Sequence, residues 1–297
     1  MDSFKKDLVL LNMVQDIGYI RLKALLDEFK EPGGILRASL DKLLSVKGIG
    51  PAIAQAVKNA GSDHDIDKEI ILINKAGAEV LTVFDEGYPE NLKNIYDPPV
   101  VLYIKGSFKK EDELSVSIVG SRKCTYYGMN MADKIAEQLA SAGVTVVSGF
   151  ARGIDTSAHK GALKAKGRTI AVLGSGLDNI YPVENKPLVE KIIKNGALIS
   201  EFPMSMPPNK NNFPRRNRLI SGLSRAVLVV EAANRSGALI TADFALEQGR
   251  DVFAVPGTAD RLLSMGTNSL IKQGAKLVDS AEDILEEFKI GKDPVFQ

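Results

Sequence analysis

The sequence predicts an α/β protein with a Rossmann-like, doubly wound and mostly parallel sheet, preceded by a small all-α domain. Three observations lead to this prediction. Short continuous apolar runs alternate with helix-length segments from Ser115 onward, apolar residues recur at helical spacing through about the first 65 residues, and glycines and arginines follow the apolar runs. Continuous apolar strands separated by helices are typical of a parallel sheet that is covered on both faces.

Length and composition fit two well-buried globular domains. The chain has 297 residues, of which 44% are hydrophobic and 25% charged, and a net charge of +1 that neither favours nor disfavours nucleic acid. No apolar run is long enough to cross a bilayer, and the N-terminus lacks the pattern of a signal peptide, so we expect a cytoplasmic protein with no membrane partner. One cysteine and two histidines exclude a disulfide within the chain and Cys- or His-rich metal sites, and we expect no metal or cofactor.

The first predicted domain, residues 1–66, is helical. Its Gly48-Ile49-Gly50 turn lies between two short apolar helices and resembles the hairpin of helix-hairpin-helix (SAM-like) modules. Glycines let a backbone approach a DNA phosphate, and the following helix N-terminus favours an anion. A hairpin that serves only as a structural turn explains the same residues, and the sequence leaves the two interpretations open.

The second predicted domain is the Rossmann-like unit at 67–290, with a lead-in at 67–113, a core at 114–258 and a helix-strand-helix unit at 259–290, before a tail at 291–297. In the core we expect strands at 116–119, 144–148, 169–173, 197–200, 226–230 and 251–255. The intervening helices are expected at 128–142, 155–165, 185–194, 216–223 and 237–248.

The stretch from Glu201 to Glu231 holds five basic residues and no acid between its two end glutamates. Taken alone, it fits a solvated basic loop as well as an anion site. However, Arg122, Arg152 and Arg235 also follow predicted strands, and ligands of such sheets bind beyond the C-terminal strand ends. Because these cations converge on one rim beside a helix N-terminus, the sequence favours a polyanion site there.

Fingerprints of nucleotide enzymes are missing. The turn Gly174-x-Gly176 lacks a third glycine, and no GxxxxGK[ST] loop occurs. Asp155 and His159 are interpreted as a helix N-terminal acid and a helix-packed histidine, so we expect no catalysis. The alternatives are a nucleotide-binding or nucleotide-hydrolysing enzyme or sensor, with Glu201, Glu231 or Asp155 as its carboxylate, and a protein-binding scaffold.

Several long motifs in the same order resemble the DNA-processing protein A family, also called DprA or Smf, over roughly residues 70–280. They are IVGSR at 118–122, SGFARGIDTSAH at 148–159, TIAVLGSGLDNIYPVENKPL at 169–188, LISEFP at 198–203, NFPRRNRLISGL at 212–223, VVEAANRSGALITADFALEQGRDVFAVPG at 229–257 and NSLIKQGA at 268–275. Some members carry a C-terminal winged-helix domain, which we do not expect in this chain, and this leaves duplex binding open.

The resemblance implies a homodimeric protein that coats and protects incoming single-stranded DNA during natural transformation and helps load the RecA recombinase onto it. By motif, Phe213 becomes a stacking residue, Gly237 and Thr241 shape the pocket, and the candidate phosphate ligands are Arg122, Lys186, Lys210, Arg215, Arg216 and Arg218. The rim also contains Lys123, Arg152, Asn217, Arg235 and Ser236. With no Trp and 6% aromatic residues, we expect few stacking surfaces, namely Phe213 and Phe150.

Overall fold

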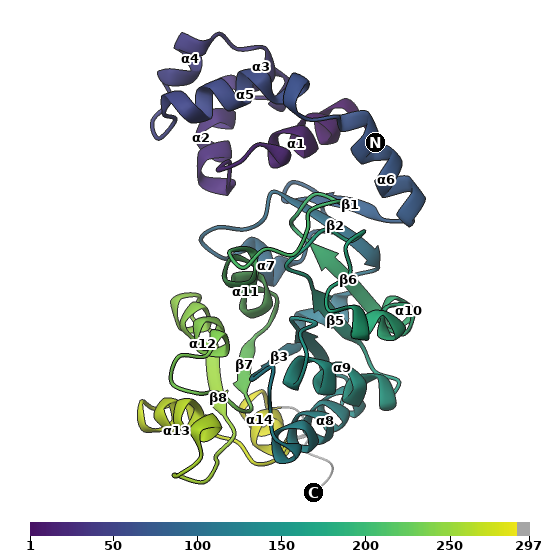
Figure 1. The fold of residues 1–297 in the computed structure, drawn as a ribbon, viewed down its shortest axis with the longest axis vertical. Helices are drawn as coiled ribbons and strands as arrows, with labels where there is room; N and C mark the ends of the chain where they lie inside the picture. The colour runs from purple at the N-terminus through teal and green to yellow at the C-terminus, as the bar shows by residue number, and fades with distance from the viewer. Residues whose placement is uncertain (290–297) are drawn as a thin grey trace, which may run out of the picture.

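The computed structural model describes residues 1–289, so the predicted tail at 291–297 lies outside the described residues. A group of short helices forms one end of the molecule, and the sheet with its covering helices forms the other (Figure 1). Among the described residues, no helix is long and apolar enough to cross a membrane.

The N-terminal part contains two hairpins of the same geometry, although the sequence pointed only to the second. In each, a residue with positive φ (Asp16 at 63° or Gly48 at 87°) and a buried isoleucine precede a glycine N-cap, Gly18 or Gly50. The helices are α1 (Ser3–Met13), α2 (Tyr19–Phe29), α3 (Pro32–Arg37), α4 (Leu40–Leu44), α5 (Pro51–Asp63) and α6 (Ile66–Ala76).

One nine-stranded sheet runs through the rest of the described chain, in the order β1-β2-β6-β5-β4-β3-β7-β8-β9. From β6 to β9 every neighbouring pair is parallel, whereas β1 and β2, from the lead-in, pair antiparallel. The predicted Rossmann-like, mostly parallel sheet is confirmed. The strands are β1 (Glu79–Thr82), β2 (Val101–Gly106), β3 (Ser115–Val119), β4 (Thr145–Ser148), β5 (Thr169–Val172), β6 (Gly196–Ser200), β7 (Ala226–Val229), β8 (Asp251–Ala254) and β9 (Lys276–Leu277).

Helices cover both faces of this sheet with apolar side chains. Residues of α8, α9 and α14 share one buried cluster, and residues of α11, α12 and α13 share another on the opposite face. The helices are α7 (Glu90–Lys93), α8 (Tyr126–Ser141), α9 (Ile154–Lys164), α10 (Lys186–Lys194), α11 (Asn212–Leu223), α12 (Gly237–Glu247), α13 (Met265–Lys272) and α14 (Glu282–Glu287), with short 3-10 turns η1 (Lys110–Glu113), η2 (Val183–Asn185) and η3 (Leu262–Ser264).

The largest boundary error concerns α11. We expected this helix to begin at Arg216, after the Phe213-Pro214 dipeptide, but it begins at Asn212. A proline is tolerated there because the first-turn N–H groups of a helix have no partner inside the helix. The consequence is that Phe213 and Arg215 are positioned by a helix rather than by a loop.

The N-terminal helices dock onto the segment that follows β6. The Asn12 side chain donates to the Glu201 carbonyl at 3.1 Å, and the Met204 N–H donates to the Glu69 carboxylate of α6 at 2.7 Å. One buried apolar cluster contains residues from both parts, including Leu8 and Met204. The division of the chain near residue 66 therefore stays a prediction, since α6 begins at Ile66 and packs with the sheet.

Candidate nucleic-acid interface

A cavity of about 720 Å³ opens at the carboxyl ends of β3 and β7. The chain proceeds from β3 to β4 on one side and from β7 to β8 on the other, so these two neighbours mark the point where the strand order reverses. Ligands of open α/β sheets bind at such a point. The walls come from the loop after β3, from α11 and from the start of α12, and they include Gly120, Ser121, Arg122, Lys123, Ala151, Asp155, Lys210, Phe213, Arg216, Asn217, Ser236, Gly237 and Thr241.

The start of α12 forms one wall. Ser236 is its N-cap and accepts a bond from the Ala238 N–H, and Gly237 leaves open space where a side chain would stand. Thr241 is buried one turn later and also lines the cavity. A helix N-terminus with free N–H groups favours an anion, which agrees with the predicted place of these three residues in the pocket.

Arg122 and Lys210 lie in the same cavity, although 88 residues separate them in the sequence. Both are exposed, as is Lys123 beside them. The Arg122 guanidinium lies 4.8 Å from the centre of the Phe213 ring. That ring packs against Gly174, where an added Cβ would stand 2.7 Å from a ring carbon. Glycine at 174 therefore allows the aromatic ring to lie against the backbone at the end of β5.

Arg216 is buried beneath the exposed cations, even though it also lines the cavity. Its Nη1 donates to the carbonyls of Gly149 and Val172, and burial lowers its pKa to about 10. Burial also raises the pKa of the Asp155 carboxyl nearby, against the opposing effect of Arg216. A side chain at Gly149 would clash with both groups. The role of Arg216 as a phosphate ligand stays a prediction: its Nη1 and Nε already donate to the protein, and the side chain also lines the cavity.

Arg218 does not line the cavity. It is buried, and its guanidinium forms ion pairs with Glu201 at 2.5 Å and Asp97 at 3.6 Å. Arg215, half-exposed, also reaches Glu201 at 3.4 Å. Asn217 does line the cavity and donates to the Gly237 carbonyl at 3.1 Å, which ties α11 to α12. Arg218 therefore pairs with carboxylates of the protein, where the sequence predicted a DNA phosphate as its partner.

The remaining predicted cations lie outside the main cavity. Arg152 lines a second, smaller hollow that shares Arg122 and Phe213 with the first. Arg235 is exposed in the loop before α12, and Lys186 is exposed at the start of α10. The expectation that Phe150 stacks on a base is wrong: its ring is 0% exposed and packs against His159.

The carboxylates considered for an enzyme are all engaged with the protein. Glu231 accepts from the N–H of Thr125 at 2.8 Å and from its hydroxyl at 2.5 Å, at the start of α8. Asp155 accepts from the Ala151 N–H, and Glu201 holds Arg218. His159 is buried, its Nδ1 lies 2.8 Å from the Thr169 hydroxyl, and burial lowers its pKa to about 3. These contacts agree with the structural interpretation of Asp155 and His159.

The sequence contained a signal that separates Arg216 from the exposed cations. Residues 216, 219, 220 and 223 recur at helical spacing, and three of them are apolar, so Arg216 falls on the buried face of α11. The helix expected at 216–223 already contains all four of these residues, so this periodicity was available in the sequence. No comparable signal marks Tyr181, which lines the second hollow from the loop after β5.

Residues 79–289 match the sequence profile of the DNA recombination-mediator protein A family. The chain belongs to this family. Residues 8–61 match a second profile, that of the SAM-like helix-hairpin-helix tandem, which agrees with the two hairpins described above. The resemblance inferred from the motifs is confirmed.

Named relatives of the family are similar over most of this chain. Protein Smf of Escherichia coli K12 is 46% identical over 227 residues, which are 76% of this chain and 61% of that protein. DNA processing protein DprA of Streptococcus pneumoniae is 46% identical over 208 residues, 70% of this chain and 73% of that one. The chain thus spans less than two thirds of the E. coli relative's length.

Two solved structures share the fold. The X-ray structure of DNA processing protein A from Streptococcus pneumoniae has a TM-score of 0.83 at 36% identity, covering 97% of this chain and 99% of that one. A structure of DNA processing protein A from Helicobacter pylori, described as giving insight into its single-stranded DNA binding mode, has a TM-score of 0.64 at 32% identity, covering 71% and 95%.

Proposed function

We propose that this protein binds single-stranded DNA, protects it as it enters the cell, and helps load RecA recombinase during natural transformation and recombination, acting as a homodimer without catalysis. One observation carries the DNA-binding part: two exposed cations, Arg122 and Lys210, lie in one cavity together with the aromatic ring of Phe213. A cation-lined groove with an aromatic surface is the arrangement that binds single strands without reading their sequence.

The relatives support the same proposal. The Streptococcus pneumoniae and Bacillus subtilis proteins are named DNA processing proteins, and the Helicobacter pylori protein binds single-stranded DNA by the description of its structure. A protein of the same family with a cationic cavity at the sheet edge suits the same ligand.

Binding should depend strongly on salt, because the contacts to phosphate are electrostatic. If about four phosphates are neutralised per subunit, the slope of log K against log salt is about −3 for a single strand. Affinity should then fall roughly fifty-fold between about 50 and 200 mM salt. A slope near zero would contradict the electrostatic part of the proposal.

The deciding experiment is a titration of labelled single-stranded and duplex DNA against wild type and the Arg122→Ala/Lys210→Ala variant. We expect wild type to prefer the single strand and the variant to lose that preference. Lys110→Ala/Lys194→Ala is the matched control, because both lysines are exposed beside the amino ends of β3 and β6, at the opposite edge of the sheet. Unchanged binding by the cavity variant rejects the site.

The recombinase-loading part needs its own measurement. We expect the protein to shorten the lag before RecA hydrolyses ATP on single-stranded DNA, and we expect the Arg122→Ala/Lys210→Ala variant to lose this effect. A lag that does not respond to the wild-type protein would remove this part of the proposal and leave DNA binding untouched.

A further inference from the structure

A second hollow continues the cavity past Phe213. It is narrow, about 20 Å³, and shares Arg122, Ala151 and Phe213 with the main cavity. Its other walls include Arg152, Gly174 and Tyr181. A strand of DNA that lies along the rim and contacts Phe213 therefore reaches this hollow with its next nucleotide.

Two aromatic rings face this hollow, and each has a guanidinium beside it. The rings of Phe213 and Tyr181 lie 6.0 Å apart, centre to centre, with 46° between their planes. Arg122 lies 4.8 Å from the centre of Phe213, and Arg152 lies 5.6 Å from the centre of Tyr181. A base between the rings needs about 7 Å, or two stacking intervals of roughly 3.4 Å, so a small outward rotation of Tyr181 makes the room.

Only weak contacts oppose that rotation. Tyr181 is 37% exposed, and its hydroxyl accepts one long bond of 3.4 Å from Arg152. Arg152 is paired with Glu184 at 2.7 Å, in an ion pair whose two side chains are both about half-exposed. Exposed ion pairs contribute little to stability. A DNA phosphate therefore competes with the Glu184 carboxylate for Arg152 at small cost.

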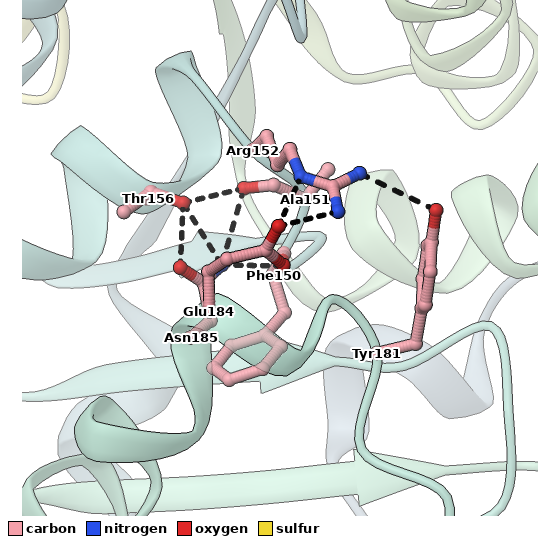
Figure 2. Close-up of polar contacts among 7 residues, drawn as sticks. All are labelled: Phe150, Ala151, Arg152, Thr156, Tyr181, Glu184 and Asn185. Atoms are coloured by element: carbon pink, nitrogen blue, oxygen red, sulfur yellow. Dashed lines mark hydrogen bonds and ion pairs between the residues drawn. The ribbon is translucent and has the colours of Figure 1, made fainter.

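Hydrogen bonds link the two backbone segments beside the hollow (Figure 2). Asn185, which is buried, donates to the Phe150 carbonyl at 2.9 Å and to the Thr156 hydroxyl at 2.9 Å. Thr156 in turn donates to the Ala151 carbonyl at 2.7 Å. These bonds join the turn that carries Arg152 to the segment that carries Tyr181 and Glu184. Only side chains have to move when a nucleotide enters.

We propose that Phe213 and Tyr181 form a second nucleotide subsite that takes one base between their rings, with Arg152 as its phosphate ligand and Glu184 occupying Arg152 when DNA is absent. This subsite rests on the proposed function, since it extends the same single-stranded DNA track. It accepts any base, because its walls offer ring faces and charge.

The first test measures stacking directly, with single-stranded DNA that carries 2-aminopurine, whose fluorescence is quenched when it stacks on an aromatic ring. We expect Tyr181→Ala to weaken binding about 5- to 150-fold, the usual effect of losing one stacked base, and to abolish the quenching. Tyr181→Phe should restore both. Tyr96→Ala is the matched control, since Tyr96 is 83% exposed and lines neither hollow.

The second test addresses the competing carboxylate. Glu184→Gln should bind single-stranded DNA about two- to fivefold more tightly, because Arg152 is then released from its ion pair. Glu190→Gln, an exposed acid on the adjacent helix α10, is the control for net charge. In the Arg152→Gln background the gain from Glu184→Gln should vanish. A gain that persists there, or that Glu190→Gln reproduces, would overturn the role of Glu184.

The outcomes separate this inference from the proposed function. If Phe213→Ala and Arg122→Ala/Lys210→Ala weaken binding while Tyr181→Ala behaves like Tyr96→Ala, the subsite is wrong and the DNA-binding function stands. If none of these variants weakens binding, both fail. Loss of quenching in Tyr181→Phe as well as Tyr181→Ala would also overturn the stacking role, because the ring is still present.

Discussion

Arg122 and Arg216 line the same cavity, yet their guanidiniums have opposite surroundings. Arg122 is exposed and lies over an aromatic ring, whereas Arg216 is buried and donates to two backbone carbonyls beside Asp155. A buried charge that has its partners holds the structure together, and an exposed one remains free for a ligand. The cations of this site therefore divide into a buried set that shapes the wall and an exposed set that we propose holds DNA.

The largest expected effect is on stability, and it comes from removing a buried cation. Arg216→Ala should lower the free energy of unfolding by about 3–5 kcal/mol, because Asp155 and two carbonyls lose their partner inside the protein. Denaturant unfolding measures this directly. Lys110→Ala, on the surface, should change stability by less than about 0.5 kcal/mol. A loss below about 1 kcal/mol in Arg216→Ala would erase the distinction between the two sets.

Acid should weaken the buried region through His159, which packs near Arg216. Its pKa in the folded protein is about 3, below the ordinary 6.5, so the unfolded chain binds the proton first as pH falls. The neutral ring contributes its full stabilisation above pH 6.5, and this contribution is lost as the pH falls toward 3. Between these two values the folding equilibrium constant falls by on the order of tenfold per pH unit.

Unfolding curves across this pH range check the contribution of His159. His159→Leu should show a smaller loss of stability than wild type, because it removes the titrating group. His64→Leu, at the other histidine, is the control and should follow wild type. Parallel pH curves for wild type and His159→Leu would show that this histidine does not govern the acid response.

The exposed set should behave in the reverse way. Phe213→Ala should leave the unfolding free energy nearly unchanged but cost about 1–3 kcal/mol in single-stranded DNA binding, since a stacking surface is lost. Fluorescence anisotropy and denaturant melts on the same preparation give both numbers. If Phe213→Ala lowered the free energy of unfolding by more than it lowered the free energy of DNA binding, Phe213 would be a structural residue rather than a stacking surface.

The smallest effect is expected for one exposed cation. Lys210→Ala should reduce the magnitude of the log–log salt slope by about 0.7, the value for one phosphate contact on a single strand. Its unfolding free energy should match that of wild type. A slope unchanged within error would mean that Lys210 makes no contact with phosphate.

Much of the architecture followed from sequence pattern. Strands β3 to β8 begin and end within one residue of their expected positions, because each contains a short, mostly apolar run that is followed by glycine, proline or a polar residue. Because the carboxyl ends of parallel strands meet at one edge of the sheet, the sequence also predicted that Arg122 and Lys210 lie in the same site. The place of Gly237 and Thr241 in the pocket wall was implied by the resemblance of their motif to the family, and Ser236 was expected on the same rim.

The predictions that failed concern residues whose burial is determined by tertiary contacts. Burial of Arg218 depends on Glu201, seventeen residues earlier, and on Asp97 from the lead-in, and neither pairing is visible in a one-dimensional pattern. Phe150 follows a strand as a base-stacking residue would, but it turns inward with a left-handed backbone, φ 59°. Sequence indicates which residues reach the edge of the sheet, and the fold decides which of them face the ligand.

The bond between Glu69 and the Met204 N–H bears on how this protein can be dissected. Met204 is fully buried and precedes Lys210 by six residues, so α6 covers the segment that leads to the cation. A truncation that removes α6 together with the earlier helices would uncover Met204 and take away its hydrogen-bond acceptor. Shortened versions intended for DNA-binding assays should therefore begin before Asp65, the N-cap of α6.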